Sequence, residues 1–66
     1  MNKDDFMGMI RDWQADNAPE YDDLEIYEPE IDEDTGRWEV IAHDANTSYV
    51  ISDDGGNIMI NYLGTK

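Results

Sequence analysis

The chain has 66 residues and a formal net charge of −13, from 17 Asp and Glu against 4 Lys and Arg. This length allows one small domain, residues 1–66, without the thick core that surrounds a deep catalytic cleft. The absence of cysteine excludes disulfides, thiolate metal sites and cysteine nucleophiles. No apolar run approaches the ~18–20 residues of a membrane span, and the excess of acid disfavours direct binding to nucleic acid or anionic lipid. We therefore expect a soluble intracellular protein whose electrostatic partner is basic.

The remaining composition favours a folded chain over a disordered one. Few aliphatic side chains together with a high net charge are typical of disorder. However, the chain also has two Trp, four Tyr and four Met, and aromatic side chains bury more area than aliphatic ones. Because the apolar residues also recur at regular intervals, we expect a folded domain that its own negative charge destabilises.

A helix is predicted over residues 2–15. Its large apolar side chains recur at helical spacing and form one stripe, which consists of Phe6, Met9, Ile10 and Trp13. Asn2 is a good N-cap residue, and Asp4 and Asp5 lie in the first turn, where the helix dipole favours anions. Because the residue before a proline disfavours helical geometry, the helix is expected to end before Pro19.

After the helix the apolar period changes to two, which is typical of strands. Four short strands joined by tight turns are predicted over residues 21–31, 37–43, 48–52 and 58–63. Trp38 is expected to face the helix, and Pro29 marks the first strand as an edge strand or a bulged one. The predicted fold is therefore α+β, with one N-terminal helix packed on a small four-stranded antiparallel meander sheet.

The last predicted strand is apolar on both faces, and one short helix can cover only one of them. Met59 and Leu63 lie on the face opposite Ile58 and Ile60. This second face is expected either to be covered by residues 20–34 or to be a surface for a partner. Of the two, cover by residues 20–34 is the favoured expectation.

The acidic segment, residues 20–34, dominates the sequence. Nine of its fifteen residues are acidic and none is basic. One interpretation is a solvated face that keeps the domain soluble. The other is a binding surface, because residues i and i+2 of a strand share a face about 6.6 Å apart, an interval on the scale of successive phosphates in one nucleic-acid strand. Glu28, Glu30 and Asp32 form such a row if the bend at Pro29 is mild.

The second interpretation defines a set of predicted partner-binding residues: Glu20, Asp22, Asp23, Glu25, Tyr27, Glu28, Glu30, Asp32, Glu33 and Asp34. The carboxylates are expected to speed association with a basic partner. Tyr21, Tyr27, Ile31 and Met59 are expected to supply the apolar contacts that slow dissociation.

Small size, strong acidity and this pattern resemble the phage-type DNA-mimic inhibitors, a class that includes anti-restriction proteins, anti-CRISPR proteins and uracil-DNA glycosylase inhibitors. Ala-Pro-Glu-Tyr at residues 18–21 and Tyr-Val-Ile-Ser-Asp-Asp-Gly-Gly-Asn at residues 49–57 are similar to segments of the uracil-DNA glycosylase inhibitor family, which is also acidic and α+β. The family's Glu-Ser-Ile strand motif is not matched by residues 24–26. The resemblance implies an inhibitor in the cytoplasm of a bacterial host that occupies the basic nucleic-acid-binding site of a host protein or nucleoprotein complex.

Two other functions stay open at this point. An acidic interaction or immunity-type module would use the apolar sheet face that includes Met59 and Leu63. A weak calcium-binding module would use the carboxylates of residues 32–36 or 53–57, although neither turn has the ligand spacing of an EF-hand loop.

No catalytic site is predicted. His43 is the only histidine, and the adjacent Asp44 would point to the other face of the strand, so we interpret His43 as a surface side chain. The Gly55-Gly56 pair is followed by a predicted strand and no lysine, unlike a phosphate-binding loop. We expect no enzyme activity, metal or cofactor, and a monomer or weak homodimer.

Overall fold

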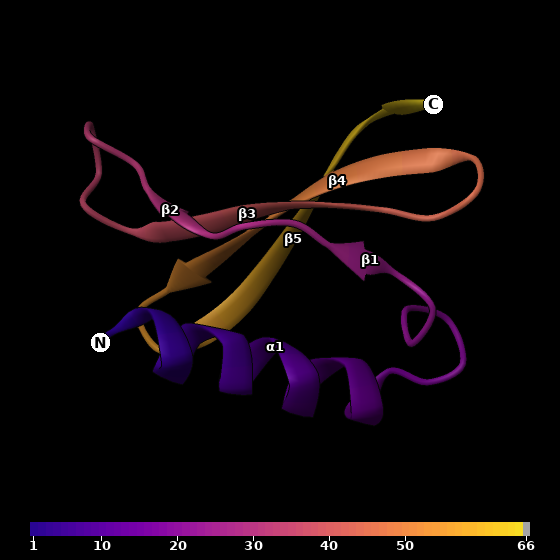
Figure 1. Ribbon diagram of the computed structural model, residues 1–66, viewed down its shortest axis with the longest axis horizontal. Helices are drawn as coiled ribbons and strands as arrows, with labels where there is room; N and C mark the ends of the chain where they lie inside the picture. The colour runs from indigo at the N-terminus through magenta and orange to yellow at the C-terminus, as the bar shows by residue number, and fades with distance from the viewer. Residues whose placement is uncertain (66) are drawn as a thin grey trace.

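The computed structural model describes residues 1–65, and side chains as far as residue 64. One helix, α1 (Lys3–Asp16), packs on one face of an antiparallel sheet (Figure 1). The strands within the described residues are β1 (Glu25–Ile26), β2 (Glu30–Ile31), β3 (Trp38–His43), β4 (Thr47–Asp54) and β5 (Asn57–Thr65). Their order across the sheet is β1-β3-β4-β5, and β2 also pairs with β3. The predicted α+β fold is confirmed, with one strand more than expected.

Helix α1 begins and ends within one residue of its predicted bounds because polar side chains satisfy its terminal backbone groups. The Asn2 side chain accepts a hydrogen bond of 2.8 Å from the Asp5 backbone N–H, and the Asp5 carboxylate accepts one from the Asn2 backbone. At the other end, the Asn17 amide donates to the Trp13 carbonyl at 2.8 Å. These caps fix the helix to a defined length over the sheet.

The core lies between α1 and the sheet face that it covers. Its buried side chains are Phe6, Ile10, Leu24, Val40, Ala42 and Ile51. Phe6 stacks on Trp38 with ring centroids 6.1 Å apart, so Trp38 faces the helix as predicted. The predicted helix stripe needs one change, because Met7 packs against the core, whereas Met9 lies at the rim of the helix face beside Trp13 and Ile58.

The first predicted strand, residues 21–31, is wrong in one respect, since it forms two short strands instead of one. Ile26 of β1 lies opposite Ala42, and Glu30 of β2 lies opposite Glu39. Three residues, 27–29, therefore oppose two on β3, which is the register of a β-bulge. The buried Pro29 lies in this insertion, where its missing N–H costs no ladder hydrogen bond.

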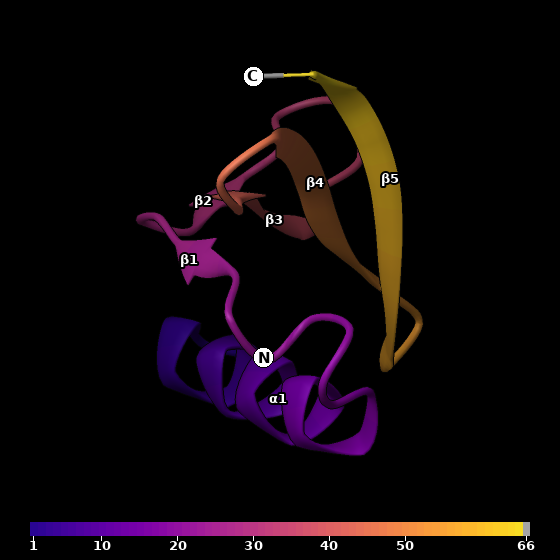
Figure 2. The same ribbon diagram turned by 90° about the vertical axis from the view of Figure 1, so that its right-hand side faces the viewer.

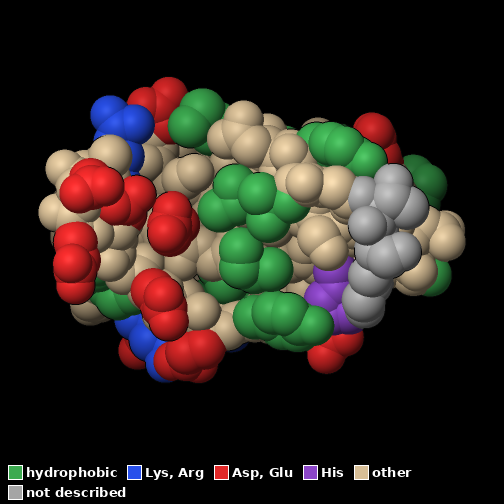
Figure 3. Space-filling model, turned by 90° about the horizontal axis from the view of Figure 1, so that it is seen from above, with side chains coloured by type: hydrophobic (Ala, Val, Ile, Leu, Met, Phe, Trp, Pro, Cys, Tyr) green, Lys and Arg blue, Asp and Glu red, His purple; other side chains and the backbone are tan. Residues whose placement is uncertain are grey.

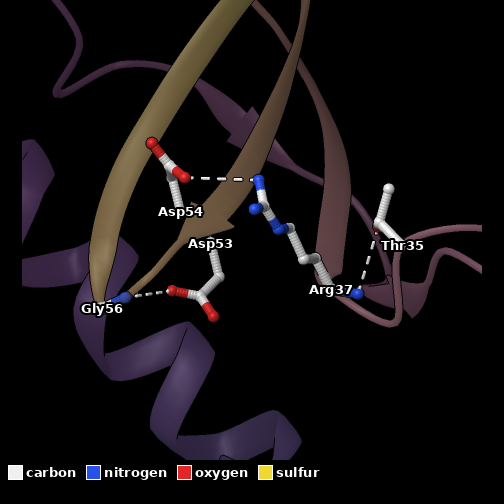
Figure 4. A network of polar contacts seen from close by, with 5 residues as sticks. All are labelled: Thr35, Arg37, Asp53, Asp54 and Gly56. Carbon is white, nitrogen blue, oxygen red and sulfur yellow. Dashed lines mark hydrogen bonds and ion pairs between the residues drawn. The ribbon is translucent and has the colours of Figure 1, made fainter.

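The β4–β5 hairpin is closed by Gly55 and Gly56, whose φ angles are 62° and 92°. Two positive φ angles define the primed turn that matches the twist of a two-residue hairpin. In the same corner, Asp53 accepts a hydrogen bond from the Gly56 N–H at 2.9 Å, and Arg37 pairs with Asp54 at 3.2 Å (Figure 4). The corner thus joins the β4–β5 turn to the start of β3.

The hairpin geometry predicts opposite effects for two glycine substitutions. Gly55→Ala is expected to lower the free energy of unfolding by about 1 kcal/mol, because a Cβ disfavours the left-handed conformation. Gly8→Ala in α1 is the matched control and is expected to raise it by roughly 0.5–1 kcal/mol, since an added Cβ meets nothing within 4 Å at either site. Urea denaturation measures both values. Equal effects of the two substitutions would contradict the positive-φ turn.

Strand β5 lies at the opposite edge of the sheet from β1 and β2 (Figure 2). The expectation that residues 20–34 cover its second face is therefore wrong. Residues 25–26 and 30–31 of that segment pair with β3 instead, which places them at the far edge of the sheet. As a result, within residues 1–65 no helix or strand lies over the sheet face opposite α1, which we call the outer face.

Candidate protein interaction surface

The outer face carries a band of exposed apolar side chains. By the alternation of β3, Ile41 points away from the core and is 40% exposed, and Leu63 on β5 is 54% exposed. Tyr27 and Met59 are also exposed, and Val50 lies opposite Ile41. Figure 3 views this face, with apolar side chains across its middle and Asp and Glu gathered at its left-hand end. An uncovered apolar band with an acidic end is a candidate interaction surface.

The acidic end is built around two glutamates that face each other. Glu30 and Glu39 are direct cross-strand partners, so both side chains leave the sheet on the same face. With Tyr27, Glu28 and Ile41 they line a hollow of about 310 Å³ at this end of the sheet. Like charges placed directly opposite one another destabilise a sheet. The fold therefore holds this pair together against its own repulsion.

The bulge is what places Glu30 on the outer face. Ile26 lies opposite the buried Ala42, so strict alternation would turn Glu30 towards the helix side. The extra residue in the bulge reverses that parity and returns Glu30 to the outer face, beside Glu39. The Tyr27 backbone N–H donates to the Ile41 carbonyl at 2.9 Å, which holds the first residue of the bulge against β3.

The predicted partner-binding acids are all on the surface or half-buried, but they do not form the expected row. Glu28 pairs with Lys3 of the helix. Asp32 is half-buried and its carboxylate accepts the Asp34 N–H at 2.8 Å, so it shapes the β2–β3 turn. The row of Glu28, Glu30 and Asp32 fails because the bend at residues 27–29 is a bulge and the three side chains have different partners.

The other predicted acids lie along the same edge or in the loop before it. Glu20, Asp22 and Asp23 are exposed in the turns between α1 and β1, and Glu33 and Asp34 are exposed in the β2–β3 turn. Glu25 is opposite His43, and its carboxylate lies 3.1 Å from His43 Nε2. The structure thus brings Glu25, Glu28 and Glu30 to one edge and leaves the remaining acids at its two ends.

His43 is not the surface side chain that the sequence suggested. Its side chain is only 12% exposed, and its ring lies 4.8 Å from that of Tyr27 and next to the Glu25 carboxylate. The register of β1 explains this, since Glu25 lies opposite His43 and strand alternation puts Tyr27 on the same face as Glu25. His43 therefore supports the position of Tyr27 on the outer face.

Tyr21 serves the fold rather than the interaction surface to which the sequence assigned it. Its ring stacks on Trp13 at 5.0 Å and meets Tyr49 edge-on at 5.9 Å. Burial, and next to it the negative charge of Glu20, raise the pKa of the Tyr21 phenol. Gln14 also donates to the Tyr21 carbonyl at 3.0 Å, so this loop is fastened to the end of the helix.

Two residues of the acidic end, Glu39 and Ile41, were missed as site residues. The alternation of residues 37–43 already assigned both to the face away from the core. Their pairing with the acidic segment could not be read from the sequence, because it depends on the cross-strand register. Glu39 in particular acquires its significance only from its position opposite Glu30.

Metal and membrane alternatives gain no support from the described residues. Across residues 1–65, no three His, Asp or Glu side chains are arranged to hold a metal ion. Helix α1, the one helix in that range, is too short and too polar to cross a membrane. No protein-family model, curated protein or solved structure matches the chain. The resemblance of residues 18–21 and 49–57 to the uracil-DNA glycosylase inhibitor family therefore stays a prediction.

Proposed function

We propose that this protein is a non-enzymatic acidic inhibitor that binds the basic nucleic-acid-binding surface of another protein and excludes DNA or RNA from it. The observation that carries the proposal is the pair of Glu30 and Glu39, held opposite one another in a hollow that Tyr27 and Ile41 also line. A fold that served only solubility would gain nothing from placing two carboxylates in direct repulsion. A cationic partner would turn that repulsion into attraction.

The chemistry of the hollow suits an Arg or Lys side chain of the partner. Its charged end would lie between the carboxylates of Glu30 and Glu39, and charge-assisted hydrogen bonds of this kind are stronger than neutral ones. Its aliphatic stem would contact Tyr27 and Ile41, which line the same hollow. Arg and Lys are also the side chains that contact phosphates in nucleic-acid-binding sites.

The distribution of charge supports long-range attraction towards this edge. Residues 4–34 contain 13 of the 17 acidic side chains. Among the described residues, Lys3 and Arg37 already pair with Glu28 and Asp54, so little positive charge is left to screen the edge. A concentrated field of one sign raises the association rate with an oppositely charged partner and selects basic surfaces.

The test is capture of a partner followed by competition with DNA. The immobilised chain is incubated with bacterial lysate in about 50 mM and in about 500 mM NaCl, between which the Debye length falls to roughly a third. We expect a basic nucleic-acid-binding protein to be retained only at the lower salt. The chain should then displace a fluorescently labelled DNA or RNA from that protein, followed by anisotropy. A captured partner that keeps its nucleic acid at saturating chain would overturn the proposal.

A second function is favoured by one observation, the uncovered apolar band of the outer face. An interaction module that used this band alone would bind through Ile41 and its apolar neighbours rather than through charge. Its partner would stay bound at 500 mM NaCl and would be lost from Ile41→Glu. The same capture experiment therefore separates the two functions by the sign and size of the salt effect.

A further inference from the structure

The two edges of the sheet differ in how they resist pairing with another strand. Exposed edges usually carry charged side chains, prolines, bulges or very short strands that prevent such pairing. The β1/β2 edge has all of these, since its strands are two residues long and are separated by a bulge with Pro29. Glu25, Glu28 and Glu30 add negative charge along it.

Strand β5 has almost none of these protections. It is nine residues long, contains no charged residue and no proline, and lies at the end of the strand order. Its one irregularity is a register shift opposite Ser48 and Tyr49, which leaves a regular stretch of residues 57–62. Tyr62 is 64% exposed, and Met59 is also exposed on this strand.

The backbone of this stretch offers hydrogen-bonding groups to a further strand. Asp54 and Asn57 flank the two-residue turn, and such flanking residues bond to each other. Along an antiparallel strand, successive residues direct their backbone N–H and C=O groups to alternate sides. The backbone groups of Ile58, Ile60 and Tyr62 therefore point away from β4, to the outer edge of the sheet. Three consecutive outward positions without a charged neighbour on the strand form a ready template for strand addition.

We propose that β5 pairs antiparallel with β5 of a second copy, so that the two sheets join into one across a two-fold axis. The charge distribution selects a second copy as the occupant. Most acids lie in residues 4–34, and the acidic β1/β2 edge lies at the other side of the sheet, so the two negative edges end up furthest apart. A basic partner would be drawn to that acidic edge, which leaves an uncharged strand as the best match for β5.

The joined sheet would place the apolar outer-face side chains of both copies side by side. With Ile60 at the two-fold axis, Met59 of one copy would lie opposite Asn61 of the other and diagonal to its Met59 and Leu63, within reach of long side chains. The dimer would also present acidic edges at its two ends, and an interface built from one self-complementary strand closes after two copies.

The test is sedimentation velocity of the full chain between about 10 µM and about 1 mM, in low and in high salt. The mass is expected to rise from 7.6 kDa towards twice that value. Higher salt should strengthen the dimer, because it screens repulsion between two negative copies. The same salt is expected to weaken capture of a basic partner, so this inference and the proposed function fail in different measurements.

Substitutions at the two edges locate the interface. Tyr62→Pro removes an outward N–H from each copy and should raise the dissociation constant about thirtyfold, from two lost hydrogen bonds of ordinary strength. The matched control is at Ile31, an exposed apolar residue of the opposite edge. A proline there would disturb pairing with β3, so the control is Ile31→Lys. It should leave the dissociation constant within about twofold of that of the parent chain.

A measurement on the unsubstituted chain keeps the inference testable if Tyr62→Pro does not fold. The amides of Ile58, Ile60 and Tyr62 should exchange hydrogen more slowly as the protein concentration rises, whereas the amides of Met59 and Asn61 should change little. A mass that stays at 7.6 kDa at 1 mM and high salt, or protection that does not alternate along β5, would overturn the proposal.

Discussion

Replacing Glu30 and Glu39 by glutamine together is expected to weaken binding to the captured basic partner by at least about tenfold near 150 mM salt. Truncating or neutralising one side of a desolvated charge pair costs roughly 2–5 kcal/mol, and partial exposure of this hollow reduces that loss. The fold should tolerate the change, because it removes like charges from two residues that are direct cross-strand partners. Fluorescence anisotropy or calorimetry with the purified partner measures the difference.

The matched control for this double variant is Asp12→Asn with Asp16→Asn. These two carboxylates are exposed and lie one turn apart on α1, so they are also like-charged neighbours. The control removes the same two negative charges from a different surface. It should change affinity by no more than about threefold, as expected for charges that act only at long range. Equal losses from both variants would show that bulk charge, not the Glu30–Glu39 hollow, governs binding.

Phe6→Ala is expected to leave most of the chain unfolded at 25 °C. The Phe6 side chain is fully buried, and it stacks on Trp38 across the only layer of core that the described residues provide. Deleting a buried Phe side chain costs roughly 3–5 kcal/mol. A domain of this length has a total stability of only about 3–10 kcal/mol, and the net charge opposes compaction further.

Near-ultraviolet circular dichroism and urea denaturation test this expectation. Phe6→Leu should lower the free energy of unfolding by about 1–1.5 kcal/mol and keep a cooperative transition, which distinguishes loss of volume from loss of the ring. Leu63→Ala, at an exposed site, should stay within about 0.5 kcal/mol of the parent chain. A cooperative urea transition of Phe6→Ala within 1 kcal/mol of the parent would show that the core does not depend on Phe6.

Local sequence signals were sufficient for the parts of the fold that depend on neighbouring residues. The Asn2 cap, the helical spacing of Phe6 and Ile10 and the glycine pair at residues 55–56 act within a few residues, and each has the predicted place in the structure. The alternation of residues 37–43 also identified the core face of β3. These features need no information on which strands pair.

The parts that failed depend on pairing between distant residues. Pro29 indicated an edge or a bulge, but only the register against β3 shows that one extra residue reverses the parity between Ile26 and Glu30. Without that register, a row of Glu28, Glu30 and Asp32 was the simplest prediction. Because the register against β3 was not known, neither the Glu30–Glu39 pair nor the burial of His43 could be predicted. The position of β5 at the far edge is likewise a property of strand order.

The bulge at residues 27–29 makes this edge tolerant of substitutions and of the loss of one residue. Substitutions within it leave the count of residues between β1 and β2 unchanged, so Glu25 and Glu30 keep their common face. Glu25 and Glu30 are five residues apart, so strict alternation would put them on opposite faces. Removing one residue of the bulge would leave two residues opposite two on β3, so both carboxylates would stay on the outer face. The acidic end of the outer face therefore depends on the pairing register against β3 as much as on its carboxylates.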